Sequence, residues 1–150
     1  MKLIGIKINN MKTNNILIRP FRIGDYEKVA ALWEEAGIHY RPNGRENRAR
    51  IAQEMKTGQA IFMVAAAGET IVGVVLGTHD GRKGWINRLA VAKEFRRQNI
   101  ALKLVTSVEN KLDELGIGVV ACLIEPENTV STTYTKAPVL YFSKKKSIDA

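Results

Sequence analysis

Residues 85–116 constrain the fold more than any other stretch of this sequence. The stretch begins with a mostly apolar run at residues 85–91, passes through a polar turn at residues 96–99 and continues with helical spacing. The apolar residues of that last part would share one helix face: Ile100, Leu104, Val108, Leu112 and Leu115. Gly116 can then adopt the positive φ that commonly ends a helix. The pattern predicts a strand, a tight turn and a long amphipathic helix.

A junction of this kind can bind an anion. The first backbone N–H groups of a helix have no acceptor within it, and the helix dipole adds partial positive charge there. Phosphate is therefore a natural ligand of such a helix start. Arg96 and Arg97 precede this helix, although two arginines there could equally be ordinary solvated charges.

The rest of the chain supplies further strands and helices. Apolar and β-branched runs predict strands at residues 16–21, 60–67, 71–78, 119–124 and 139–142. Helical patterns occupy about residues 26–36, with Asp25 as the expected N-terminal cap, and about residues 46–56. The strand after the long helix should run parallel to the strand before it, whereas residues 68–70 suit a hairpin turn.

Composition and length fit one globular domain. The chain has 150 residues, of which 45% are hydrophobic. No apolar run approaches the roughly 20 residues of a membrane span, and the N-terminus is too interrupted for a signal peptide. The single cysteine, Cys122, fits a reducing compartment and is expected to be a core residue, so we expect a cytoplasmic protein. His39 and His79 show no metal-ligand spacing, and we expect no metal site.

The net charge of +8 could indicate nucleic-acid binding, but much of it lies at the termini. Residues 1–15 contribute +3 and residues 141–150 contribute +2, which leaves +3 for residues 16–140. Terminal charge runs are usually solvated, and no basic recognition helix or aromatic platform is evident. A nucleic-acid-binding module is therefore the least favoured function.

The turn and the helix start resemble a known motif. Residues 96–101 are similar to the pyrophosphate loop of the GNAT superfamily of N-acetyltransferases, whose pattern is Arg/Gln-x-x-Gly-x-Gly/Ala. Arg96 and Ala101 match the pattern, while Asn99 stands where the family usually has Gly. Because Asn tolerates left-handed backbone geometry, we expect a positive φ at Asn99. The segment at residues 18–22, followed by Asp25, also resembles the first strand and helix of the family.

A second resemblance lies near the C-terminus. GNAT chains commonly run Asn-x-x-Ala/Ser to a Tyr, then Lys-x-Gly-Phe and a closing hairpin, and this chain has Asn128, Ser131, Tyr134 and Lys136. The Tyr comes one residue early and the Gly-Phe is absent, so the C-terminal hairpin looks shortened by about one strand. Either the last strand pairs in an altered way, or a homodimer partner covers an open edge.

The resemblance covers about residues 16–142 and implies the GNAT acyltransferase fold, a mixed α/β arrangement with a central, mostly antiparallel sheet flanked by helices. We expect an N-terminal extension at residues 1–15, one domain at residues 16–143 and a basic tail at residues 144–150. The implied activity is transfer of an acetyl group from acetyl-CoA to a primary amine of a small molecule or peptide. A protein of this fold that binds an acyl-CoA without transferring the acyl group is the alternative.

The resemblance also assigns roles to residues. Leu89, Ala90 and Val91 would pair with the pantetheine arm, and a backbone N–H near Ala90 or Val91 would be the oxyanion donor. The pyrophosphate would be held mainly by backbone N–H groups of six residues: Arg96, Arg97, Gln98, Asn99, Ile100 and Ala101. Asn128 would bind the pantetheine arm or position Tyr134, which would protonate the leaving thiolate; both could instead be structural.

The general base is less well defined. Many GNAT enzymes place a Glu on the strand before the phosphate loop, where this chain has Asn87 and Arg88. Glu125, a water held by Asn87, or an amine that arrives already neutral are the alternatives. His39 and Tyr40 could contact the acceptor or could be half-buried loop residues.

Overall fold

A computed structural model describes residues 15–38, 40–123 and 140–144 of the chain. The strands are β1 (Ile16–Pro20), β2 (Ala60–Ala67), β3 (Thr70–His79), β4 (Gly84–Val91), β5 (Val119–Leu123) and β6 (Leu140–Lys144). The α-helices are α2 (Tyr26–Glu35), α3 (Arg48–Thr57) and α4 (Ile100–Glu114), and the 3-10 turns are η1 (Ile23–Asp25) and η2 (Lys93–Phe95). The order of strands and helices predicted for these residues is confirmed.

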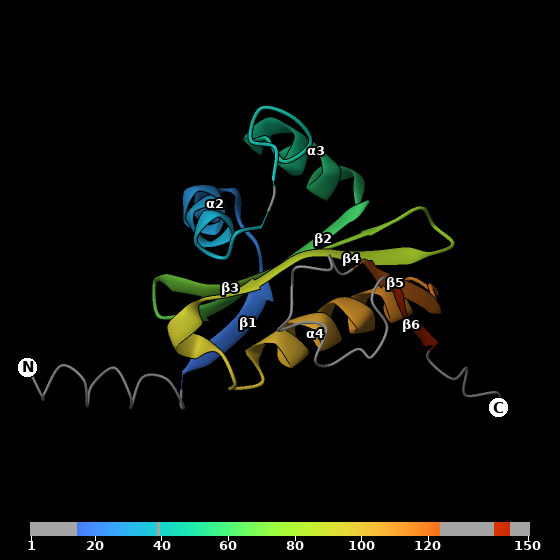
Figure 1. Cartoon of the computed structure of the whole chain (residues 1–150). Coiled ribbons are helices and arrows are strands. Elements are labelled where there is room, and N and C mark those ends of the chain that lie inside the picture. Colours follow the sequence, from blue (N-terminus) through green and yellow to red (C-terminus); the bar gives the residue numbers. More distant parts are fainter. Residues whose placement is uncertain (1–14, 39, 124–139, 145–150) are drawn as a thin grey trace, which may run out of the picture.

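The described strands form one six-stranded sheet in chain order. Neighbouring strands are antiparallel except for β4 and β5, which are parallel because α4 connects them. Figure 1 shows α2 and α3 on one side of the sheet and α4 on the other. This arrangement is the predicted mixed α/β fold, in which the sheet is covered on both faces.

Each face of the sheet has its own apolar core. Leu104, Val108 and Leu112 of α4 are fully buried against one face, and Val29 and Trp33 of α2 are fully buried against the other. Strands covered on both faces are apolar on both, which explains why the run at Ala60–Ala67 does not alternate with polar residues. No helix in the described part of the chain has the length and apolar character needed to span a membrane.

Glycines in β3 and β4 allow α4 to approach the sheet closely. A Cβ atom added at Gly77 would lie 2.5 Å from Cγ1 of Val108, and one added at Gly84 would lie 2.7 Å from Cδ1 of Leu112. Both distances are far shorter than the 3.5–4.0 Å or so of an ordinary carbon–carbon contact. The glycines therefore set the position of α4, and with it the position of the helix start.

Three local predictions were wrong in detail. Asp25 occupies the N-cap position of α2 but makes no side-chain cap, because its carboxylate binds Arg19 and the backbone N–H of Arg22. The second helix begins at Arg48 rather than near residue 46, because the side chain of Asn47 accepts from the Arg50 N–H at 2.8 Å and caps it. Leu115 was expected on the buried face of the long helix, but it follows the last turn and is 57% exposed.

Candidate active site

Strand β4 contains a bulge close to its end. Val74 of β3 pairs with Ala90 and Leu76 pairs with Asn87, so one residue of β3 faces two residues of β4, Arg88 and Leu89. Arg88 has a φ of 52°, in the left-handed region that non-glycine residues rarely adopt. A bulge of this kind bends a strand and disrupts its ladder.

The described pairing between β4 and β5 ends just before the bulge. The parallel register runs from Gly84 opposite Val120 to Ile86 opposite Cys122 and ends there. Among the described residues, the segment at residues 87–91 therefore has a neighbouring strand only on its β3 side. In the described part of the chain, no strand occupies the side of this segment that faces away from β3, where backbone groups could hydrogen-bond a ligand. This segment contains the predicted pantetheine-binding residues Leu89, Ala90 and Val91.

The turn after β4 has two residues with left-handed backbone. Asn99 has φ 61° and ψ 16°, which confirms the predicted positive φ, and Arg97 also has a φ of 61°, which was not predicted. The first hydrogen bond into α4 runs from the Lys103 N–H to the Asn99 carbonyl at 3.0 Å. The N–H groups of the three preceding helical residues, Ile100, Ala101 and the exposed Leu102, thus have no acceptor within the helix.

Two side chains of the turn have polar atoms directed at the protein. The Arg96 Nε–H donates to the Val91 carbonyl at 3.2 Å, which ties the turn back to the end of β4. The Oε1 atom of Gln98 is buried and accepts no hydrogen bond from the described residues. The turn is therefore anchored to β4 through Arg96 and contains a buried hydrogen-bond acceptor on Gln98.

A pocket of about 300 Å³ lies between the C-terminal end of α2 and the end of β4. Its lining residues are Leu32, Glu35, Ala36, Val91, Ala92, Lys93 and Arg96. The pocket thus joins predicted residues of the strand and of the turn. Its volume is at the lower end of the range of roughly 300–1,000 Å³ that small-molecule pockets span.

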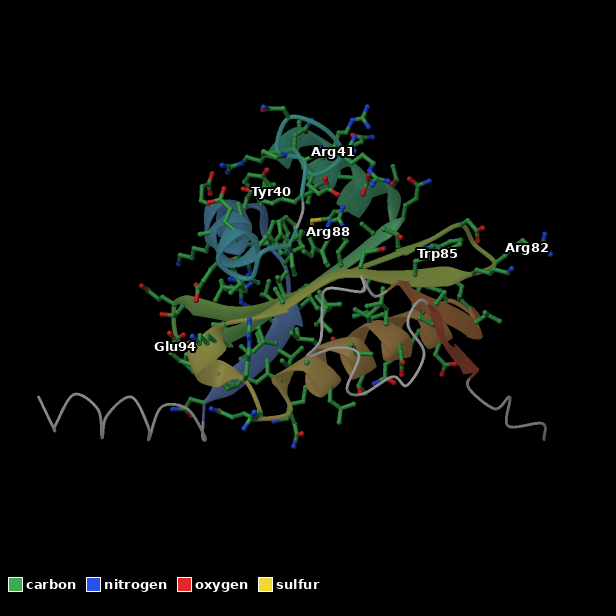
Figure 2. The ribbon with its side chains drawn as sticks, viewed as in Figure 1. Tyr40, Arg41, Arg82, Trp85, Arg88 and Glu94 are labelled. Atoms are coloured by element: carbon green, nitrogen blue, oxygen red, sulfur yellow. The ribbon has the colours of Figure 1, made fainter. Side chains whose placement is uncertain are left out.

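A polar cluster lies on the same face of the sheet as this pocket, between the sheet and the two helices α2 and α3. The Arg88 guanidinium NH2 group donates to Oε1 of Glu46 at 3.0 Å, and Glu46 is only 5% exposed. Oε2 of Glu46 accepts from the Arg41 N–H at 2.8 Å, and the Glu46 carbonyl accepts from the Tyr26 hydroxyl at 2.7 Å. Figure 2 shows Arg88, Tyr40 and Arg41 on this side of the sheet.

Tyr40 is fixed at the margin of this cluster. Its hydroxyl donates to Oε1 of Glu34 at 2.7 Å, and its ring centroid lies 5.3 Å from that of Trp33. The bond to the Glu34 carboxylate raises the pKa of Tyr40 to about 12, so the phenol is neutral at physiological pH. The pKa of Tyr26 is also raised, mainly because its hydroxyl is partly buried. Both hydroxyls are therefore donors that help to fix the loop between α2 and α3.

The structure reaches only some of the predicted site residues. Those in the segment at 89–91 and in the turn at 96–101 are described, whereas Glu125, Asn128, Tyr134 and His39 lie outside the described residues. Asn87, a candidate for holding a catalytic water, is half-buried, and its Nδ2 lies 3.4 Å from the Thr78 hydroxyl. Within the described part of the chain, no group of three or more His, Cys, Asp or Glu residues could hold a metal ion.

Glu46 was not identified as a site residue from the sequence. It had been placed at the start of the second helix, where an acidic residue is ordinary. Its partner Arg88 lies 42 positions further along the chain. No local pattern could have indicated this pair, because only the folded sheet brings the two residues together.

Comparisons with known proteins agree with this architecture. The model of the Acetyltransferase (GNAT) family matches residues 26–136. The acetyltransferase plu1384 of Photorhabdus laumondii is 32% identical over 141 residues, which cover 88% of this chain and 96% of that protein.

Solved structures share the fold at lower identity. The PaiA N-acetyltransferase of Thermoplasma acidophilum, solved in complex with coenzyme A, has a TM-score of 0.76 at 16% identity and covers 88% of this chain and 100% of its own. YncA of Salmonella typhimurium, a putative acetyltransferase solved with acetyl-CoA, has a TM-score of 0.66 at 17% identity and covers 80% of this chain and 76% of its own.

Proposed function

The chain belongs to the GNAT family of acetyltransferases and is thus an acyltransferase, and we propose that it transfers an acetyl group from acetyl-CoA to a primary amine. The observation that carries this proposal is the junction of β4 and α4. There a strand segment that, among the described residues, pairs only with β3 leads into a turn with left-handed backbone at Arg97 and Asn99 and then into free helix N–H groups.

The turn is suited to a pyrophosphate. The N–H groups of Ile100 and Ala101 lie at the positive end of a 15-residue helix, where anions are stabilised. Left-handed residues in a turn help to direct successive N–H groups into one concavity that can hold an anion. We propose that residues 96–101 bind the CoA pyrophosphate mainly through the backbone, with the Arg96 side chain fixing the turn to Val91.

The open segment of β4 is suited to an amide-containing arm and to the developing oxyanion. The backbone of Leu89, Ala90 and Val91 would hydrogen-bond the pantetheine arm on the side away from β3, apart from the Val91 carbonyl, which accepts from Arg96. A backbone N–H near Ala90 or Val91 would stabilise negative charge on the acetyl oxygen. When bound, acetyl-CoA supplies the activated acetyl group as a thioester. Among the residues outside the described ranges, Asn128 would assist binding of the arm.

Proton transfers are assigned to other residues. Tyr134 would give a proton to the departing thiolate sulfur. Glu125, or a water held by Asn87, would take a proton from the amine, unless the amine arrives neutral.

The acceptor would enter from the side of α2 and α3, where Tyr40 is fixed. The protein would act in the cytoplasm, and dimerisation stays an open prediction.

A turnover screen tests this function. Purified protein would be incubated with acetyl-CoA and a panel of polyamines, amino acids, aminoglycosides and peptide N-termini, and CoA release would be followed with a thiol reagent. We expect CoA release that depends on one class of amine. Acetyl-CoA binding by calorimetry without turnover on any amine would favour the alternative, a protein that binds acyl-CoA without transferring the acyl group.

The turn itself is tested by two neighbouring variants. Proline requires a φ near −65°, which is incompatible with the observed 61° at Asn99, so Asn99→Pro should abolish CoA binding. Arg97→Ala removes an exposed side chain but retains the backbone, so it should change the dissociation constant for CoA by less than about tenfold. Wild-type affinity in Asn99→Pro would refute the backbone assignment.

A further inference from the structure

We propose that Glu46 and Trp33 are positioning residues that act through Arg88 to hold the bulge of β4 in place. This inference rests on the proposed function, because its catalytic consequence requires the segment at residues 89–91 to contact the thioester. It assigns a role to a buried acid and a buried indole that neither bind the cofactor nor transfer a proton.

The bulge needs to be held because its conformation is unfavourable for arginine. Arg88 has a φ of 52°, and a bulky residue in this region is retained only when its surroundings enforce it. Arg88 is also a charged residue within a central strand of the sheet, and its side chain is only 22% exposed. Without specific partners, this segment would relax toward regular pairing or exchange between conformations.

Trp33 holds the backbone of the bulge. Its indole Nε1–H donates to the Arg88 carbonyl at 3.1 Å, and the tryptophan itself is fully buried in α2. Since the bulge takes this carbonyl out of the β ladder, the indole supplies the donor that a neighbouring strand would otherwise provide. Helix α2 is therefore hydrogen-bonded directly to Arg88, the bulge residue of β4.

Glu46 holds the side chain of the same residue. Its carboxylate accepts from the Arg88 NH2 group at 3.0 Å and from the Arg41 N–H at 2.8 Å, so both of its oxygens are engaged. The Arg88 Nε–H is buried and has no hydrogen-bond partner among the described residues, where Glu46 provides the one side-chain hydrogen bond to this guanidinium. Burying a carboxylate is costly unless it is paired, and here the pairing joins the loop before α3 to the bulge.

The catalytic consequence follows from the position of the bulge. The bulge at Arg88 and Leu89 leads directly into Ala90 and Val91, and the described pairing of β4 with β5 ends just before it, at Ile86. Movement of the bulge would shift the proposed oxyanion donor relative to the thioester, whereas the pyrophosphate turn is also held by the start of α4, in addition to the Arg96 bond to Val91. A misplacement of about 1 Å can cost a reaction roughly 10²-fold. Loss of the Glu46 contact should therefore affect kcat more than CoA binding.

The test compares Glu46→Gln with Glu27→Gln. The control removes an exposed ion pair in which Arg48 of α3 donates to Glu27 of α2 at 2.6 Å, so it also breaks a contact between these two helices. With the best amine of the panel, Glu46→Gln should lower kcat about tenfold or more while the dissociation constant for CoA changes less than about threefold. Glu27→Gln should leave both values within about twofold of wild type. An unchanged kcat in Glu46→Gln, or an equal loss in Glu27→Gln, would overturn the inference.

A second measurement is independent of turnover. Amide hydrogen exchange in residues 87–91 should accelerate about tenfold or more in Glu46→Gln and in Trp33→Phe, which keeps an aromatic ring but lacks the indole donor, while exchange in α4 stays unchanged. Equal acceleration in β4 and α4 would indicate general destabilisation and would refute a local holding role. If wild-type protein turns over no amine, the proposed function fails, but the exchange result still decides whether Glu46 and Trp33 hold the bulge.

Discussion

Substituting Gly77 with alanine tests whether close contact between α4 and the sheet sets the position of the helix start. The added Cβ would lie 2.5 Å from Cγ1 of Val108 and 3.3 Å from the backbone carbonyl oxygen of Ile61. The first distance is about 1 Å shorter than a normal carbon–carbon contact. Ile61 limits movement on the other side, so either Val108 changes rotamer or α4 moves outward. Overpacking of this kind costs about 1–3 kcal/mol.

Urea denaturation measures this cost and Val108→Ala identifies its cause. Gly77→Ala should lower the free energy of unfolding by about 1–3 kcal/mol, equivalent to a decrease of about 2–12 °C in Tm for a domain of this size. Val108 is fully buried, so Val108→Ala alone should cost about 2 kcal/mol through the cavity that it leaves. The new methyl group of Gly77→Ala would fill that cavity. The loss in free energy of unfolding of the double variant should therefore be smaller, by about 1 kcal/mol or more, than the sum of the two single losses.

The matched control is Gly118→Ala. No atom lies within 4 Å of a Cβ added at Gly118, so this substitution should change the free energy of unfolding by no more than about 1 kcal/mol. The reasoning fails if Gly77→Ala is as stable as wild type, or if the losses from Gly77→Ala and Val108→Ala simply add. The first result would mean that Val108 or α4 can give way without cost, and then the close contact at Gly77 would not determine where the phosphate turn lies.

Three further predictions concern single side chains. Asn99→Gly should bind CoA at least as well as wild type, whereas Asn99→Val should lose about 1–2 kcal/mol of stability to left-handed strain; thermal melts in which Val equals Asn would contradict the assigned backbone. The guanidinium of Arg19 lowers the pKa of Asp25, so this pair stabilises the protein above pH ~4 and the stabilisation is lost as the pH falls below that value. The stability difference between wild type and Asp25→Asn in urea should therefore shrink from pH ~5 to pH ~2, and a constant difference would contradict this account. Tyr134→Phe should lower turnover roughly 10²-fold with CoA affinity nearly unchanged, and full turnover would make Tyr134 a packing residue.

Local sequence patterns predicted the elements of the fold because each pattern is set by neighbouring residues. The spacing in Ile100–Glu114 and the position of Gly116, which has a φ of 78°, were sufficient for α4. The positive φ of Asn99 followed from the substitution of Asn for Gly in a motif that needs this geometry. Asp25 was misassigned because a cap competes with other partners, and Arg19, six residues earlier, binds its carboxylate.

The geometry of the site depends on contacts between distant segments and could not be predicted in this way. The bulge at Arg88 is defined by its register against β3, and a single sequence does not reveal which residue a strand leaves unpaired. The Trp33 indole reaches the Arg88 carbonyl across 55 positions of the chain. The sequence pattern of α2 predicts that Trp33 is buried, but not that its nitrogen contacts β4. The roles of Glu125, Asn128 and Tyr134 stay predictions.

The contacts of Glu46 bear on the choice of general base. The sequence lacks a Glu on β4, yet the fold brings the Glu46 carboxylate to Arg88, on the side of the sheet from which the acceptor would enter. Both carboxylate oxygens already accept hydrogen bonds, and protonating either would weaken a contact that holds the bulge. Glu46 is therefore better suited to positioning than to proton transfer. This leaves Glu125, a water held by Asn87, or a neutral amine as the source of deprotonation, and the pH dependence of kcat/KM on the identified amine would distinguish an enzyme group from the amine itself.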